Sequence, residues 1–252
     1  MMQEYANVSF DIMDALKLKN PPIAISFADA VPTGFGAPAK RAPAGCRFWE
    51  DATNASFATS SADHFLCAIG VYTHNLEPSP AQQADLMDAI KVFGDLGYVR
   101  QEDLPLIPVL QSQPRYVLYS PLAEMPLTPD VVLLFADAAQ ALILSEATQQ
   151  VEGGNAPAMG RPACAVVPQV MNSGRAAMSL GCCGARAYLS LLNDSISLFA
   201  FPGARIGAYA EKIVALASAN AVLSRFHQVR HQDIHAGLSP TIHESLQAMA
   251  SS

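Results

Sequence analysis

The fold of this chain is decided by residues 129–146, PDVVLLFADAAQALILSE. The apolar run Val131 to Phe135 predicts a β-strand. From Ala138 to Glu146 the apolar residues instead recur at the spacing of a helix. A strand that passes through a short turn into a helix is typical of a β-α unit that packs on a sheet. The segment therefore predicts a fold of the α/β class.

Signals of the same two kinds recur on both sides of this segment. Apolar runs predict further strands at residues 23–27, 115–119, 176–180 and 196–201. Helical spacing predicts helices at residues 1–20, 79–97 and 206–229. We expect a mixed β-sheet of about five to seven strands with packed helices, as a single compact unit over residues 1–252. Residues 238–252 are expected to form a terminal helix or a tail.

The composition favours extensive burial and disfavours two classes of partner. Hydrophobic residues make up 51% of the chain and charged residues 15%, which indicates a large core, with a homo-oligomer interface as one further place to bury apolar surface. The formal net charge is -7 and no run of Lys or Arg stands out, so nucleic acid binding is disfavoured. The longest apolar stretches are interrupted by Asp137 and Gln140, so no membrane span is expected.

The first residues of the chain and its cysteines favour a cytoplasmic location. Glu4, Asp11 and Asp14 stand where a secretion signal would carry a basic start followed by an apolar run. Five cysteines without such a signal are expected to be thiols or metal ligands, because disulfides are rare in a reducing compartment.

Four of the five cysteines lie in separate segments, at Cys46, Cys67, Cys164 and Cys182. No CxxC pair is present, so a shared site would have to be assembled by the tertiary fold. Gly181 and Gly184 would let backbone N–H groups approach the sulfur of the last of these cysteines. The plainer interpretation is that all four are buried structural thiols. Cys183 follows Cys182 directly, and because adjacent side chains diverge, only one of the two is expected to serve a common centre.

Histidines offer further candidate ligands. His64 precedes Cys67 by three positions, which on a helical turn puts both side chains on one face. It is therefore a candidate additional metal ligand, a haem ligand or a catalytic base, and otherwise a hydrogen-bonded core or rim residue. His227, His231 and His235 are spaced by four and would share one face of a helix. A solvated or interface face is the expected role of these three, since no HExxH motif accompanies them.

Two arginines are candidate ligand-binding residues. Arg161 and Arg186 each follow a glycine-containing turn close to a cysteine. If the cysteine segments converge, the two guanidinium groups would form an electropositive pocket that binds a carboxylate or phosphate. Otherwise they are ordinary loop arginines. No P-loop or GxGxxG motif supports nucleotide binding.

Four motifs occur in an order and spacing that resemble a known family. They are DHFLCAIGVYTH at 63–74, PDVVL at 129–133, GRPACA at 160–165 and SLGCCGAR at 179–186. Together they make the chain similar, over about residues 16–230, to the DUF169 (ArCR-like) family of uncharacterised proteins.

The resemblance implies that Cys46, Cys67, Cys164 and Cys182 occupy positions where similar proteins carry cysteine. Four thiolates suit an iron-sulfur cluster of the [4Fe-4S] type or an all-cysteine zinc site. Iron is preferred because structural zinc sites usually use paired local cysteines. We therefore expect a cytoplasmic metalloprotein with a redox or small-molecule-binding role.

Two functions from other classes remain open, both with no metal. In the first, the chain is a binding module that holds a small anionic ligand with its arginines while the cysteines only pack. In the second, it is a cysteine-dependent enzyme that uses Cys182 or Cys67 as nucleophile with His64 as base.

Overall fold

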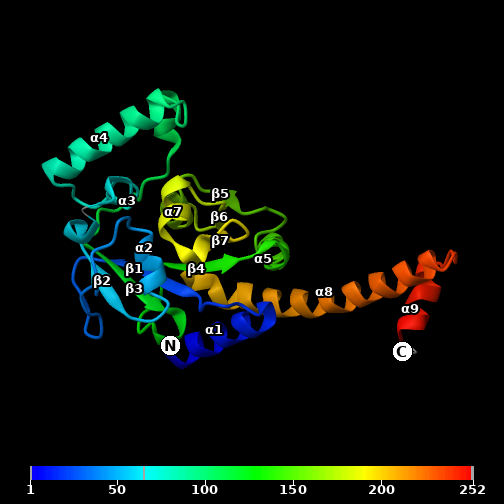
Figure 1. Cartoon of the computed structure of the whole chain (residues 1–252). Coiled ribbons are helices and arrows are strands. Elements are labelled where there is room, and N and C mark those ends of the chain that lie inside the picture. Colours follow the sequence, from blue (N-terminus) through cyan, green and yellow to red (C-terminus); the bar gives the residue numbers. More distant parts are fainter. Residues whose placement is uncertain (1, 65, 251–252) are drawn as a thin grey trace.

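A computed structural model describes residues 2–64 and 66–250. In this part of the chain seven strands form one mixed sheet, in the order β2-β3-β1-β4-β7-β6-β5 (Figure 1). Neighbouring strands are antiparallel except for the parallel pair β5 and β6. The predicted α/β fold and its mixed sheet are thereby confirmed. The strands are β1 (Ile23–Ala28), β2 (Phe57–Thr59), β3 (Tyr116–Pro121), β4 (Val131–Ala136), β5 (Ala158–Met159), β6 (Ala177–Ser179) and β7 (Ser197–Pro202).

The strand of the opening segment, β4, lies at the centre of the sheet between β1 and β7. Its register places Leu133 opposite Ile23 on one side and Ala200 on the other. All six of its residues are buried. Odd-numbered residues of β4 pack in one hydrophobic core and even-numbered residues in a second core. Both faces of the sheet are therefore covered, which explains why this strand is apolar without alternation.

One face of the sheet is covered by three long helices, α1 (Met2–Leu16), α5 (Ala138–Val151) and α8 (Ile206–His235). Asp137 and Gln140, the polar residues that interrupt the apolar stretch, form a capping box at the start of α5. The Asp137 side chain accepts hydrogen bonds from the N–H groups of Ala139 and Gln140, each at 2.9 Å. The sequence thus changes from strand to helix within two residues.

Four short helices cover the opposite face of the sheet. They are α2 (Arg47–Asp51), α3 (Ala68–Thr73), α6 (Val166–Ser173) and α7 (Cys183–Tyr188). Each contributes apolar side chains to the core that contains the odd-numbered residues of β4. Because all four helices share one face, segments that are far apart in the sequence meet there (Figure 1).

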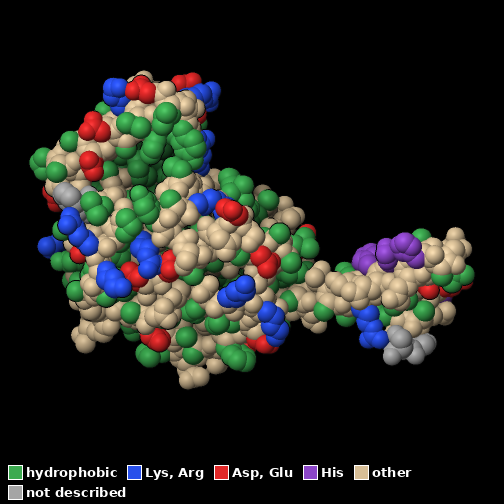
Figure 2. All heavy atoms as spheres, in the orientation of Figure 1, with side chains coloured by type: hydrophobic (Ala, Val, Ile, Leu, Met, Phe, Trp, Pro, Cys, Tyr) green, Lys and Arg blue, Asp and Glu red, His purple; other side chains and the backbone are tan. Residues whose placement is uncertain are grey.

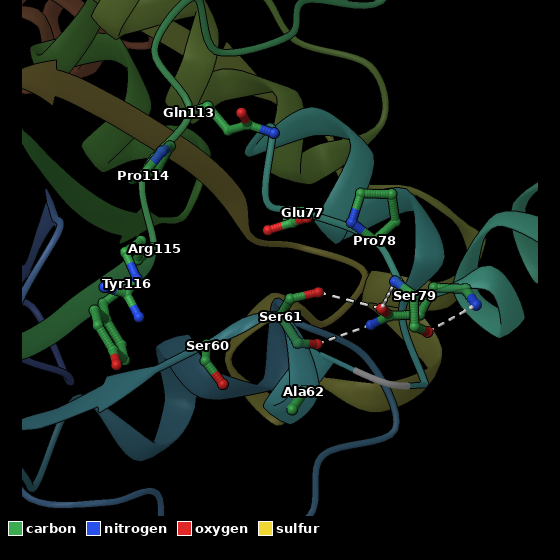
Figure 3. Close-up of a pocket in the computed structure, with 11 residues that line it drawn as sticks. Ser60, Ser61, Ala62, Glu77, Pro78, Ser79, Gln113, Pro114, Arg115 and Tyr116 are labelled. Carbon is green, nitrogen blue, oxygen red and sulfur yellow. Dashed lines mark hydrogen bonds between the residues drawn. The ribbon is translucent and has the colours of Figure 1, made fainter.

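Helix α4 (Pro80–Asp95) stands away from the sheet and is attached mainly at its start (Figure 1). Ser79 and Gln82 form a capping box there, and the buried Gln82 amide donates to the carbonyl of Ser61 at 2.8 Å. The Ser61 hydroxyl in turn donates a hydrogen bond to the side-chain Oε1 of Gln82 at 3.1 Å. Figure 3 shows Ser61 and Ser79 of this attachment, which line a surface pocket. A 3-10 segment, η2 (Gln101–Leu106), follows the helix.

The outer half of α8 projects from the body, and α9 (Ile242–Ala250) folds back against it (Figure 1). The predicted helix therefore continues past residue 229 to His235, and the last segment, expected as a helix or a tail, forms a helix over Ile242–Ala250. Among the described residues, Gly203–His235 is by length and composition alone apolar enough to cross a membrane, a test that core helices of soluble proteins also pass.

Candidate functional site

The structure brings Cys46, Cys67, Cys164 and Cys182, here called the four thiols, to the lining of one cavity. Three of them stand directly before the helices α2, α3 and α7. Cys164 lies in the 3-10 turn η4 (Ala163–Ala165), which leads into α6. The four short helices on one face of the sheet thus each carry one of the thiols at their start.

The pKa values of Cys46, Cys67 and Cys164 are raised by burial and by charge on neighbouring thiols. Burial raises the pKa of Cys46 well above its usual range, and charges on Cys164, Cys67 and Cys182 would raise it further. Burial likewise raises the pKa of Cys164, with added repulsion from Cys67 and Cys182. Burial also raises the pKa of Cys67, and Cys182 adds to the effect. Without a bound cation, these three groups are protonated at neutral pH.

Hydrogen-bond donors from the protein face two of these sulfurs. Backbone N–H groups of Gly45 and Gly70 donate to the sulfur of Cys67, which partly offsets the effect of burial on its pKa. The hydroxyl of Thr73 bonds to Cys164 and acts in the same direction. Donors of this kind favour a thiolate over a thiol.

The two glycines are required for this approach. A Cβ on Gly70 would lie 3.0 Å from the Cys67 Sγ, and a Cβ on Gly45 would lie 2.6 Å from the Nδ1 of His64. The sequence predicted this role for Gly181 and Gly184. A Cβ on Gly181 would instead meet Leu192 and Arg186, so its small size serves the packing of that loop.

The described thiols do not form a ready-made site for a single metal ion. Among residues 2–64 and 66–250, no group of three or more His, Cys, Asp or Glu side chains is close enough together to hold one metal ion. Four thiolates around one zinc ion at about 2.3 Å would have to bring their sulfurs within about 4 Å of one another. A [4Fe-4S] cluster bonds each thiolate to a different iron and so accepts a wider arrangement.

Two buried histidines lie behind the thiols. The Nε2 of His64 is 3.0 Å from the hydroxyl of Thr59, and its ring lies 6.1 Å from that of His74, between ring centroids. Its Nδ1 and both ring nitrogens of His74 have no hydrogen-bond partner in the described structure. Burial lowers the pKa of His64 to about 4 and that of His74 to about 3. Both rings are therefore neutral at neutral pH, and neither is part of the cavity lining.

The two histidines predict a loss of stability in acid. Between pH 6.5 and about 4 the unfolded chain binds more protons than the folded chain, so the free energy of unfolding falls as the pH is lowered through this window. Each histidine contributes roughly 3 kcal/mol to the loss. In urea titrations of the metal-free protein, we expect the unfolding midpoint to fall steeply from pH 6.5 to 4. His74→Leu, which cannot be protonated, should make that decline shallower, and an unchanged decline would contradict the assignment.

The cavity extends well beyond the thiols, with a volume of about 630 Å³. Arg161 lines it, whereas Arg186 does not. The guanidinium group of Arg186 donates to the backbone carbonyls of Asn193, Leu180 and Ile196 and so holds the loop around Gly181. The two arginines consequently do not form one electropositive pocket.

The remaining histidine candidates lie far from the thiols. His227, His231 and His235 share one face near the outer end of α8 (Figure 2). The rings of the last two are 4.5 Å apart between centroids. Cys183, the fifth cysteine, is exposed at the same cavity as the four thiols.

Comparison with known proteins gives one match. The model of the DUF169 family, described as uncharacterised ArCR, matches residues 11–212. No curated protein and no solved structure gives a significant match.

Proposed function

This chain belongs to the DUF169 family of uncharacterised ArCR proteins, and we propose that it binds a [4Fe-4S] cluster through Cys46, Cys67, Cys164 and Cys182. The observation that carries the proposal is the convergence of four thiols from four separate segments on one cavity. Free thiols pack readily in cores, but packing alone gives no reason for all five cysteines to line one cavity, four of them from separate segments.

The arrangement of the thiols favours a cluster over zinc. The absence, in the described residues, of a group tight enough for one ion argues against a closed tetrahedral site. The donor set is all sulfur, which suits iron-sulfur chemistry. A cluster held by four thiolates would supply one-electron transfer to a molecule in the cavity.

The protein's own groups would tune such a centre. The N–H groups of Gly45 and Gly70 and the hydroxyl of Thr73 would stabilise negative charge on the sulfurs that they face. Hydrogen bonds to cluster sulfurs, together with burial, are what set reduction potentials in such sites. A cytoplasmic location, which we also propose, would keep the thiols reduced.

Anaerobic purification of the full chain tests the proposal. We expect a brown protein with about four iron and four acid-labile sulfide per chain and a broad absorbance near about 400 nm. Stoichiometric zinc without sulfide would contradict the cluster, as would a metal-free protein that fails to take up iron and sulfide on anaerobic reconstitution. A sharp Soret band would assign the site to haem instead.

Alkylation rates separate the cluster protein from a cysteine-dependent enzyme. In metal-free protein at pH 7, we expect iodoacetamide to label exposed Cys183 first and to label Cys46 and Cys164 at least about tenfold more slowly, because a protonated, buried thiol is a poor nucleophile. Peptide mass spectrometry over a time course gives the order. Rapid labelling of Cys67 or Cys182 in a Cys183→Ser background would favour the enzyme.

A further inference from the structure

We infer that the cavity above the four thiols is a binding site for an uncharged, mainly apolar organic molecule. The part of the cavity beyond the thiols, here called the chamber, is walled by α4, η2 and the segments that follow each of them. Its apolar lining includes Ile90, Phe93, Tyr98, Leu104 and Ile107. Figure 2 shows hydrophobic side chains gathered between α4 and the body of the molecule.

The size of the cavity exceeds what the thiols need. Cavities that bind organic ligands usually measure about 300 to 1,000 Å³, and this one measures about 630 Å³. The thiols and the apolar residues line the same cavity, so a ligand bound there would share it with whatever the thiols hold.

Two of the three charged residues in the described lining already have partners, which bears on the class of ligand. Arg161 donates to the carbonyl of Tyr98 at 2.5 Å, and its guanidinium carbon lies 5.3 Å from the centre of that ring. Asp103 accepts two hydrogen bonds from Arg100, at 2.9 and 2.6 Å. The only other charged residue that the described lining contains, Asp85, is exposed and negative. With Asp103 neutralised by Arg100, the single positive charge of Arg161 is balanced by Asp85, so the described lining offers no net positive charge to an anion and an uncharged ligand fits better.

The inner face of helix α4 is a second observation that favours a bound ligand in the chamber. Its apolar side chains on the inner face, such as Ile90 and Phe93, are only half-buried, and they front the cavity rather than a core. Phe93 meets Tyr98 edge-on, with ring centroids 6.0 Å apart, so the wall presents aromatic surface. Filling the chamber would remove this apolar surface from water, which favours binding. A ring-containing molecule suits such a wall.

This inference deepens the proposed function. A reaction between the ligand and the thiol site would require the cluster proposed above, but binding of the ligand in the chamber would not.

The binding is tested by titrating the uncharged dye Nile red into the anaerobically purified full chain and following the fluorescence of the dye. We expect saturable binding of one dye per chain with a blue-shifted emission. The anionic dye 1-anilinonaphthalene-8-sulfonate should bind at least about tenfold more weakly.

Matched variants of one helix locate the dye. Ile90→Asp, on the inner face of α4, should weaken Nile red binding at least about tenfold, whereas Val92→Asp, which is exposed and does not line the cavity, should leave it unchanged. Iron and sulfide contents should not change in either variant. Equal effects of the two variants, tighter binding of the anionic dye, or no saturable binding would overturn the inference. A lower sedimentation coefficient for Ile90→Asp but not for Val92→Asp would mean that the chamber wall contacts a second copy of the chain. That result would also overturn the inference.

The two proposals fail in different ways. If the chain binds the dye but holds no iron, the chamber proposal is supported and the cluster proposal is contradicted. If the chain holds full iron and sulfide but does not bind the dye, the cluster proposal is supported and the chamber proposal is contradicted.

Discussion

Replacing Cys164 by alanine will reduce the iron content of the anaerobically purified protein from about four atoms per chain to below about one, with a parallel loss of sulfide and of the broad absorbance. Cys164 is buried and lines the cavity, so no surface side chain can easily take its place at the iron. Alanine removes the sulfur while leaving the start of α6 sterically undisturbed. Cys46→Ala should have the same effect, since that thiol is also buried.

The matched control for this experiment is Cys183→Ala. Its side chain is exposed and is adjacent in sequence to Cys182, so the same chemical change is made a short distance from the proposed ligands. We expect full iron and sulfide in this variant. Circular dichroism of the metal-free forms should agree among all variants, which excludes misfolding as the cause of metal loss. Equal loss of iron in Cys183→Ala and Cys164→Ala would contradict the assignment of ligands.

Replacing Gly203 by alanine will lower the free energy of unfolding by about 4 kcal/mol or more, or prevent folding altogether. A Cβ at this position would lie 1.9 Å from the carbonyl oxygen of Pro129 and 2.5 Å from its carbonyl carbon. Both are backbone atoms beside the start of β4, and the N–H of Gly203 bonds to the carbonyl of Asp130 at 2.9 Å. The clash can be relieved only by moving the central strand of the sheet away from the start of α8.

Gly207 provides the control for this prediction. It lies in the first turn of α8, and a Cβ there would meet nothing within 4 Å. Gly207→Ala should therefore be neutral or should stabilise the protein by up to about 1 kcal/mol, because alanine favours helix. Urea denaturation monitored by circular dichroism measures both changes. A destabilisation of less than about 1 kcal/mol in Gly203→Ala would mean that β7 and β4 are not joined as the structure has them.

The strands and helices with a strong periodic signal were predicted from sequence, as was the short strand β6, whereas most of the other short elements were missed. The run Val131 to Phe135 is apolar throughout because both faces of β4 are covered, and this is visible without coordinates. Strands β2 and β5 span three and two residues, too few to show alternation. Helices α2, α3 and α7 have five or six residues, less than two turns, so their periodicity cannot be distinguished from chance.

The candidate site was only partly predictable for a physical reason. The family-like positions of the cysteines identified the four thiols, but their convergence depends on which face of the sheet each short helix covers. The role of Gly45 and Gly70 had a weak signal in sequence, since each lies within three residues of a thiol. Arg186 was predicted to bind a ligand because of its motif. In the structure its guanidinium group donates hydrogen bonds to backbone carbonyls of Leu180 and Ile196, which only the folded loop places within reach.

The chamber could not be predicted from sequence at all. The apolar face of α4 has the spacing of an ordinary core helix, and nothing local indicates that it fronts a cavity. Its position depends on the attachment of Gln82 to Ser61, a contact between residues 21 positions apart.

X-ray absorption at the iron edge of the anaerobically purified protein tests the central claim most directly, because it reports the atoms around the metal. We predict a first shell made of sulfur only, followed by a short iron-iron distance, as a [4Fe-4S] cluster held by four thiolates requires. A first shell of nitrogen and oxygen, or iron without a neighbouring iron, would contradict the account.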